Sequence, residues 1–207
     1  MITKKQLKEY LLMDYPFDKD ILNHSASSNK RNFSYLHNTS VVSGGGYATT
    51  NLMTSRNNGG IDFSKDCCIY FEYKFISNGA SDWNHVFSFG THNNDGGDSS
   101  YYQVYTNAPR ESPSFMQAPY DSNWHSLMLS FTTESSNTTI SGYIDDALSK
   151  TTTVSNLGTI SSFYLFGSGC GDEMTSNIRN FKLFQGIKNY MTDGNVPILY
   201  SDIRLSK

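Results

Sequence analysis

The segment at 123–147, NWHSLMLSFTTESSNTTISGYIDDA, holds two runs in which apolar and polar residues alternate. Residues two apart share one face of a β-strand. One face of the first run is apolar and carries His125, Leu127, Leu129 and Phe131. A polar tip, TTESSNTT, joins the two runs and is rich in turn residues. The segment therefore predicts a long β-hairpin with one face that must be buried.

Similar alternating runs recur along the chain, with turn residues between them. The other expected strands cover 32–37, 46–53, 67–76, 84–91, 100–106, 114–118, 163–168, 177–185 and 196–205. The 207 residues include 14 Tyr and 13 Phe but only 5 Pro, a mixture that suits strands and polar loops. Many short strands without alternating helices predict an all-β fold, specifically an antiparallel two-sheet jelly-roll sandwich.

The N-terminal stretch has a different pattern. Residues 3–12 predict a short helix, since Thr3 and Gln6 have capping-box spacing. We therefore expect a helical anchor at 1–13, docked on its own domain or on a partner subunit, and a sandwich domain at 14–207. No apolar run is long enough to span a bilayer, and LeuLeuMet is too short for a signal-peptide core. No signal peptide and no membrane insertion are expected.

The order of the strands resembles the laminin-G-like branch of the concanavalin A-like lectin/glucanase superfamily. The matching pieces run from 14 to 207: DYPFDKDILNHSAS, GGYATT, CIYFEYKF, HVFSFGT, NWHSLMLSF, ISGYIDD, FYLFGS and NIRNFKLFQG. The resemblance implies that the hairpin lies in one sheet and packs its apolar residues against the other: Leu127, Leu129, Phe131, Ile140 and Ile144. The family has Asp-Gly at the turn where this chain has Asp145-Asp146, which leaves the turn type open.

Catalysis is not expected from the acids. Glycosidases of this fold carry Glu-x-Asp-x-x-Glu along one strand, so that the carboxylates share a face. None of the five glutamates is followed two residues later by Asp, and Glu72 has Lys74 as its same-face neighbour. The histidines and cysteines lack metal-ligand spacing, and Cys67 and Cys68 point to opposite faces as buried thiols. The sequence predicts no catalytic residue, no required cofactor and no defined metal site.

One polar loop is the candidate ligand site. Sugar binding requires aromatic faces beside polar groups, and Trp83, Tyr101 and Tyr102 flank a loop that carries Asp95 and Asp98. The alternative is that these aromatic residues cap the core. The segment at 93–98, NNDGGD, also offers oxygen ligands for calcium, although the same residues form ordinary loops.

These observations predict a non-catalytic carbohydrate-binding or adhesion module that recognises a surface polysaccharide or glycan. An adhesin-like domain without an export signal indicates a bacteriophage virion protein of a tail or head fibre, or another extracellular or cell-surface location. The alternatives are a structural virion or cell-surface domain that assembles with itself or with other virion proteins, and a glycoside hydrolase of the same fold. The net charge of -3 is well mixed and shows no basic stripe, so nucleic acid is not an expected partner.

Overall fold

The computed structural model describes residues 9–17, 20, 22–33, 35–41, 47–54, 61–77, 85–89, 102–105, 114–155, 157–160, 163–167 and 174–186. In this part of the chain the regular elements are strands, apart from residues 9 and 10, which are helical as expected for 3–12. Their bounds are β1 Leu11–Tyr15, β2 Tyr35–Val41, β3 Tyr47–Thr54, β4 Ile61–Asp62, β5 Cys67–Ser77, β6 His85–Phe89, β7 Tyr102–Tyr105, β8 Ser114–Gln117, β9 His125–Glu134, β10 Asn137–Ile144, β11 Ala147–Ser155, β12 Thr159–Ile160, β13 Phe163–Leu165 and β14 Thr175–Gln185.

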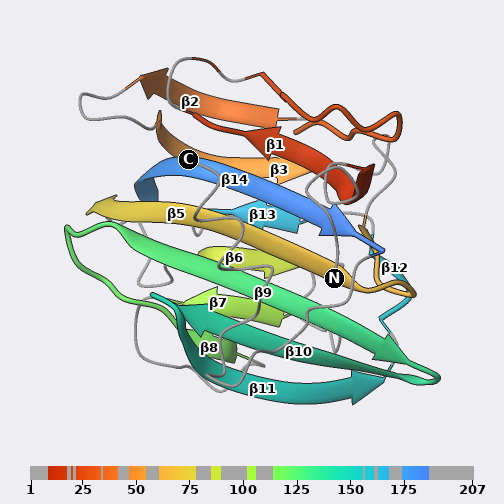
Figure 1. Cartoon of the computed structure of the whole chain (residues 1–207). Helices are drawn as coiled ribbons and strands as arrows, with labels where there is room; N and C mark the ends of the chain where they lie inside the picture. Colours follow the sequence, from red (N-terminus) through yellow and green to blue (C-terminus); the bar gives the residue numbers. More distant parts are fainter. Residues whose placement is uncertain are drawn as a thin grey trace, which may run out of the picture.

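The strands form two stacked layers (Figure 1). The front layer has the order β11-β10-β9-β5-β14, and β1 pairs with β14. The back layer has the order β13-β6-β7-β8. Strand β3 joins the layers, because its residues 47–49 pair with β14 and its residues 52–54 pair with β13. The all-β sandwich expected from the sequence is therefore confirmed, although β7 and β8 run parallel.

The hairpin predicted at 123–147 lies in the front layer, between β11 and β5. Strands β9 and β10 pair from Glu134 and Asn137 to Leu127 and Ile144, and β10 continues through a two-residue turn into β11. Both turn residues, Asp145 and Asp146, have positive φ angles of 47° and 74°. Two consecutive residues with positive φ are typical of a type I′ turn, which settles the turn that Asp-Asp had left open.

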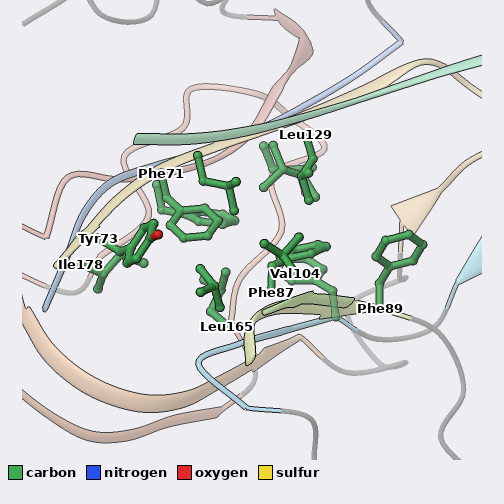
Figure 2. Packing of buried hydrophobic residues seen from close by; sticks show 14 of the residues in the cluster. Phe71, Tyr73, Phe87, Phe89, Val104, Leu129, Leu165 and Ile178 are labelled. Atoms are coloured by element: carbon green, nitrogen blue, oxygen red, sulfur yellow. The ribbon is translucent and has the colours of Figure 1, made fainter. Parts of the chain in front are cut away.

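The core lies between the two layers and is largely aromatic (Figure 2). The residues predicted to pack between the sheets do so: Leu127, Leu129, Phe131 and Ile140 are fully buried there, and Ile144 packs against them. Phe163 of the back layer lies 5.7 Å from Phe87 and 6.0 Å from Phe181 of the front layer, measured between ring centroids. Such ring pairs add about 0.5–1.5 kcal/mol each beyond the area they bury.

The N-terminal expectation needs one correction. Leu11 and Leu12, placed at the end of a helix by the sequence, belong to β1, which pairs with β14 over Leu11–Tyr15. The backbone partners on β14 and the buried side chains outweigh the helical pattern, as tertiary contacts often do. Residues 1–8 and the strand expected at 196–205 lie outside the described residues. The division at residue 13 stays a prediction.

Strand β11 was not expected from the sequence. Its nine residues, ALSKTTTVS, form the edge of the front layer and are mostly exposed. An edge strand that buries neither face has no apolar alternation to reveal it. The structure therefore extends the predicted two-stranded hairpin to a three-stranded meander.

Gly142 marks a close approach of the two layers, which generates the first prediction. A Cβ atom at this position would lie 2.1 Å from the Met116 sulfur and 2.8 Å from Cε1 of Phe115, both on β8. Gly142→Ala should therefore lower the free energy of unfolding by about 1–3 kcal/mol, as overpacking does. Urea denaturation followed by circular dichroism measures the change.

Lys150 supplies the matched control, because it pairs with Gly142 across β10 and β11 and is exposed. Lys150→Ala should change the unfolding free energy by less than about 0.5 kcal/mol. A Gly142→Ala chain as stable as the Lys150→Ala chain would contradict the close approach.

Candidate functional site

The structure describes the backbone of one of the five residues predicted to bind a ligand. Tyr102 begins β7 and pairs with Phe89 of β6 in the back layer. The other four lie outside the described residues: Trp83, Asp95, Asp98 and Tyr101. The candidate calcium segment at 93–98 lies outside them as well. This loop site stays a prediction, and the described residues contain a different cluster of polar groups.

A bulge in β14 shapes that cluster. Arg179 pairs with Glu72 and Lys182 pairs with Tyr70, so three steps along β14 match two steps along β5. Asn180 lies in the bulge with a φ of 54°, a left-handed conformation that Asn tolerates better than most residues. The extra residue turns the Arg179 and Lys182 side chains to the same face, the one opposite the core.

Glu72 is the centre of the cluster and is only 5% exposed. Its Oε1 accepts hydrogen bonds from the Tyr70 hydroxyl at 2.9 Å and from the Asn180 amide at 3.0 Å. Its Oε2 accepts a hydrogen bond from Arg179 Nε at 2.5 Å. A buried carboxylate is stable only with such partners, because its desolvation is costly. The carboxylate thereby fixes the guanidinium plane of Arg179.

Trp124 completes the cluster from the loop before β9. The Arg179 Cζ atom lies 4.0 Å from the centre of the Trp124 ring, which is the geometry of a cation–π contact. The Trp124 side chain is half-buried, and the Arg179 side chain is 28% exposed. We call Tyr70, Glu72, Trp124, Arg179 and Asn180 the front-face cluster.

The front-face cluster combines the groups that recognise a sugar. Arg179 donates to Glu72 through Nε, and its terminal amino groups are two further planar donors. The Trp124 indole N–H donates to no other described residue and is a second donor beside an aromatic face. An aromatic ring with convergent polar donors can stack on a pyranose or furanose ring and bind its hydroxyls.

His125 lies directly beside the cluster, at the start of β9. Its Nδ1 is 2.6 Å from Asp145 Oδ2, and its Nε2 is 3.0 Å from Asp121 Oδ1. The His125 ring is also 6.0 Å from the ring of Tyr73. The sequence predicted a packed strand residue here; the side chain is indeed only 13% exposed, but the two carboxylate partners were not foreseen.

The remaining candidates are the cysteines and possible metal ligands. Cys67 and Cys68 are buried free thiols on opposite faces, as predicted, and burial raises the pKa of each well above its ordinary value. Within the described ranges, no three His, Cys, Asp or Glu side chains are grouped so as to hold a metal ion. The described part of the chain also has no helix long and apolar enough to cross a membrane.

Known proteins were compared with this chain by sequence and by structure. No protein-family model matches the sequence, and no curated protein matches it. Among solved structures, domain 4 of AbnA, an extracellular GH43 arabinanase from Geobacillus stearothermophilus solved with arabinotriose, superposes with a TM-score of 0.50 at 14% identity. That match covers 85% of this chain and 92% of the other.

The binding domain of botulinum neurotoxin DC, solved in complex with SialylT, gives a TM-score of 0.51 at 13% identity. The match covers 95% of this chain but only 52% of that one, so this chain spans about half of the neurotoxin domain. Similarity at this level of identity shows the fold alone. The fold is a lectin-like β-sandwich, as the resemblance had implied.

Sequence reasoning missed the front-face cluster for a clear reason. Glu72 and Arg179 are 107 residues apart in the chain, and only the order of strands brings them together. A signal was present, since Glu72 lies in a mostly apolar strand, CCIYFEYKFI, where a carboxylate that becomes buried needs a cation. Trp124 has no distinguishing signal of its own within the alternating segment at 123–147.

The ion pair in the cluster generates the second prediction. Arg179→Met should lower the free energy of unfolding by about 2–4 kcal/mol, because it leaves the buried Glu72 carboxylate without its cation; part of that cost is relieved by the partial exposure of the pair. Adding Glu72→Gln should recover some of this loss, since the remaining side chain is neutral. Guanidinium denaturation of the single and double variants measures the coupling.

An exposed ion pair provides the comparison. Lys65 Nζ lies 3.4 Å from Asp62 Oδ2, and the Lys65 side chain is 64% exposed. Lys65→Met should change the unfolding free energy by less than about 1 kcal/mol. Equal losses for Lys65→Met and Arg179→Met would show that Glu72 does not depend on Arg179.

Proposed function

We propose that this chain is a non-catalytic carbohydrate-binding module and that the front-face cluster is its glycan site. The observation that carries the proposal is the Trp124 ring held against Arg179, whose guanidinium is in turn fixed by the buried Glu72 carboxylate. Aromatic and guanidinium groups held rigidly lose little entropy when a ligand binds, which favours affinity.

Polar residues at the β11 edge of the front layer share the face opposite the core. Ser141 pairs with Thr151 on that face, whereas Ser130, the partner of Ser141 on β9, is buried. The Ser141 and Thr151 hydroxyls are 3.2 Å apart. Exposed hydroxyls on this face suit a hydroxyl-rich ligand.

The structural neighbours support the ligand class. The arabinanase domain was solved with arabinotriose and the neurotoxin binding domain with SialylT. A surface polysaccharide or glycan is therefore the partner we propose. A virion or cell-surface location, and assembly with itself or with other virion proteins, stay predictions.

The proposed role is binding rather than hydrolysis. The described partners of Glu72 are hydrogen-bond donors: the Tyr70 hydroxyl, the Asn180 amide and the Arg179 guanidinium. A hydrolytic pair requires a second carboxyl group roughly 5–10 Å away across the sugar. The donors around Glu72 instead suit a carboxylate that positions Arg179.

A glycan array that includes arabinan oligosaccharides and sialylated glycans tests the proposal. We expect the unaltered chain to bind a defined glycan and Trp124→Ala to weaken that binding by about tenfold or more, as the loss of an aromatic anchor does. Tyr10→Ala is the control, because Tyr10 is another part-exposed aromatic residue, at 37% exposure, and lies near Gly186. Tyr10→Ala should bind as the unaltered chain does.

Three further measurements separate the alternatives. The Trp83→Ala, Tyr101→Ala double variant tests the loop site predicted from the sequence; if it loses binding while Trp124→Ala keeps it, the site lies at that loop. Release of reducing sugar that is lost in Glu72→Gln would instead assign a glycoside hydrolase. An array without any bound glycan, together with an oligomer in solution, would favour the structural role.

A further inference from the structure

The structure places a histidine between two carboxylates at the base of the loop that carries Trp124. A neutral imidazole has one N–H and one lone pair, whereas the charged ring has two N–H donors. His125 has Asp145 at Nδ1 and Asp121 at Nε2, so both contacts are hydrogen bonds only when the ring is charged. This requirement follows from the positions of the atoms alone.

Asp121 connects the His125 ring to the Trp124 loop. Its Oδ1 atom accepts a hydrogen bond from the backbone N–H of Asn123 at 2.7 Å and is the same atom that faces His125 Nε2. Asn123 directly precedes Trp124. A single carboxylate oxygen therefore joins the ring of His125 to the backbone that positions Trp124 on Arg179.

The two ends of the loop differ in how they are fixed. Residues 119 and 120 are held by contacts that do not titrate near neutral pH: the Tyr73 hydroxyl donates to the Pro119 carbonyl at 2.9 Å, and the Tyr120 ring lies 4.1 Å from the Phe75 ring. Residues 121–124 are held by the Asn123 N–H bond to Asp121 and by the contact of Trp124 with Arg179. The side chain of Asp121 is 50% exposed, so loss of the His125 contact leaves the Asn123 N–H as its described partner and lets the carboxylate turn toward solvent together with that segment.

We propose that His125 is a proton-dependent clamp on the front-face cluster. While charged, it bridges Asp145 and Asp121 and keeps Trp124 on Arg179. When the ring loses a proton, the shorter contact to Asp145 keeps the remaining N–H, and the lone pair of Nε2 repels Asp121. The segment 121–124 is then released, and the glycan site loses the fixed position of Trp124. This regulation rests on the proposed function, since it changes ligand binding only if the cluster is the site.

The charges around the ring set the pH range. The described groups that face His125 are Asp121, Asp145 and the Tyr73 phenol. Partial burial lowers the pKa of His125, but the hydrogen bonds to Asp145 and Asp121 and their negative charges outweigh it, so the pKa is raised above the ordinary 6.5. The Asn123 N–H and His125 lower the pKa of Asp121, which keeps it charged.

The sign of the effect follows from the raised pKa. The clamp is fully formed below pH 6.5 and is lost as the pH rises through the higher value of the folded chain. Above that value the charged fraction of His125 falls about tenfold per pH unit. Glycan affinity should fall with it, until the residual affinity of the open site is reached.

Acrylamide quenching of Trp124 fluorescence tests the clamp without a ligand. Trp83→Phe leaves Trp124 as the only tryptophan in the chain. Its lifetime-corrected quenching constant should rise with pH, at the same midpoint as the NMR titration of the His125 ring. Asp121→Asn should remove the transition, because an amide can accept from the charged ring and donate to the neutral one. Asp121 is exposed, so this variant should remain folded.

A second histidine–carboxylate pair is the control. His24 Nε2 lies 3.0 Å from Asp20 Oδ1, and the His24 side chain is 48% exposed. His24→Asn should leave the Trp124 transition unchanged. A flat quenching profile while His125 titrates, or a transition that persists in Asp121→Asn, would overturn the clamp.

The outcome also separates this inference from the proposed function. A quenching transition in a chain that binds no glycan on the array would support the clamp and overturn the glycan site. A glycan that binds equally at about pH 5.5 and pH 8.5, with Trp124 protected at both, would overturn the clamp and leave the proposed function standing.

Discussion

The extra residue in β14 is the constraint on which both faces of the front layer depend. In a regular strand, residues three apart point to opposite faces, yet Ile178 and Phe181 are both fully buried in the core. The bulge at Asn180 makes this arrangement possible, and it sends Arg179 and Lys182 to the other face. The Asn180 N–H donates to the carbonyl of Pro16, the residue after β1, at 2.9 Å, so the chain leaving β1 holds the bulge in place. One irregular residue thus serves the core and the candidate site together.

The face of the front layer opposite the core carries two ion pairs. Lys182 Nζ lies 2.7 Å from Asp14 Oδ1, which ties β14 to β1, while Arg179 and Glu72 tie β14 to β5. Each cation of β14 therefore faces an acid on a different neighbour. This pattern fixes which strand lies on which side, because a shift of register would leave a partly buried charge without its partner.

Most of the architecture could be predicted from period-two patterns, since an alternating strand reveals its buried face in sequence. The misses had physical causes. Strand β11 is an exposed edge, and β1 has a helical pattern that pairing with β14 overrides. The candidate site was harder, because its residues come from a loop and two strands that adjoin only in the folded sheet. The Trp-His pair at 124 and 125 was noticed, but the carboxylates facing the histidine are four and twenty residues away in sequence.

Glu72 and Arg179 are far apart in the chain, so a ligand that binds their cluster can distinguish folded from partly folded molecules. A cluster assembled from residues more than a hundred positions apart exists only after the long-range pairing of β5 with β14 is complete. Any molecule that recognises it discriminates against partly folded chains and, by mass action, raises the melting temperature of the finished domain. Ligand binding would then select for the native state, because it retains molecules with complete strand pairing and does not retain those with unpaired strands.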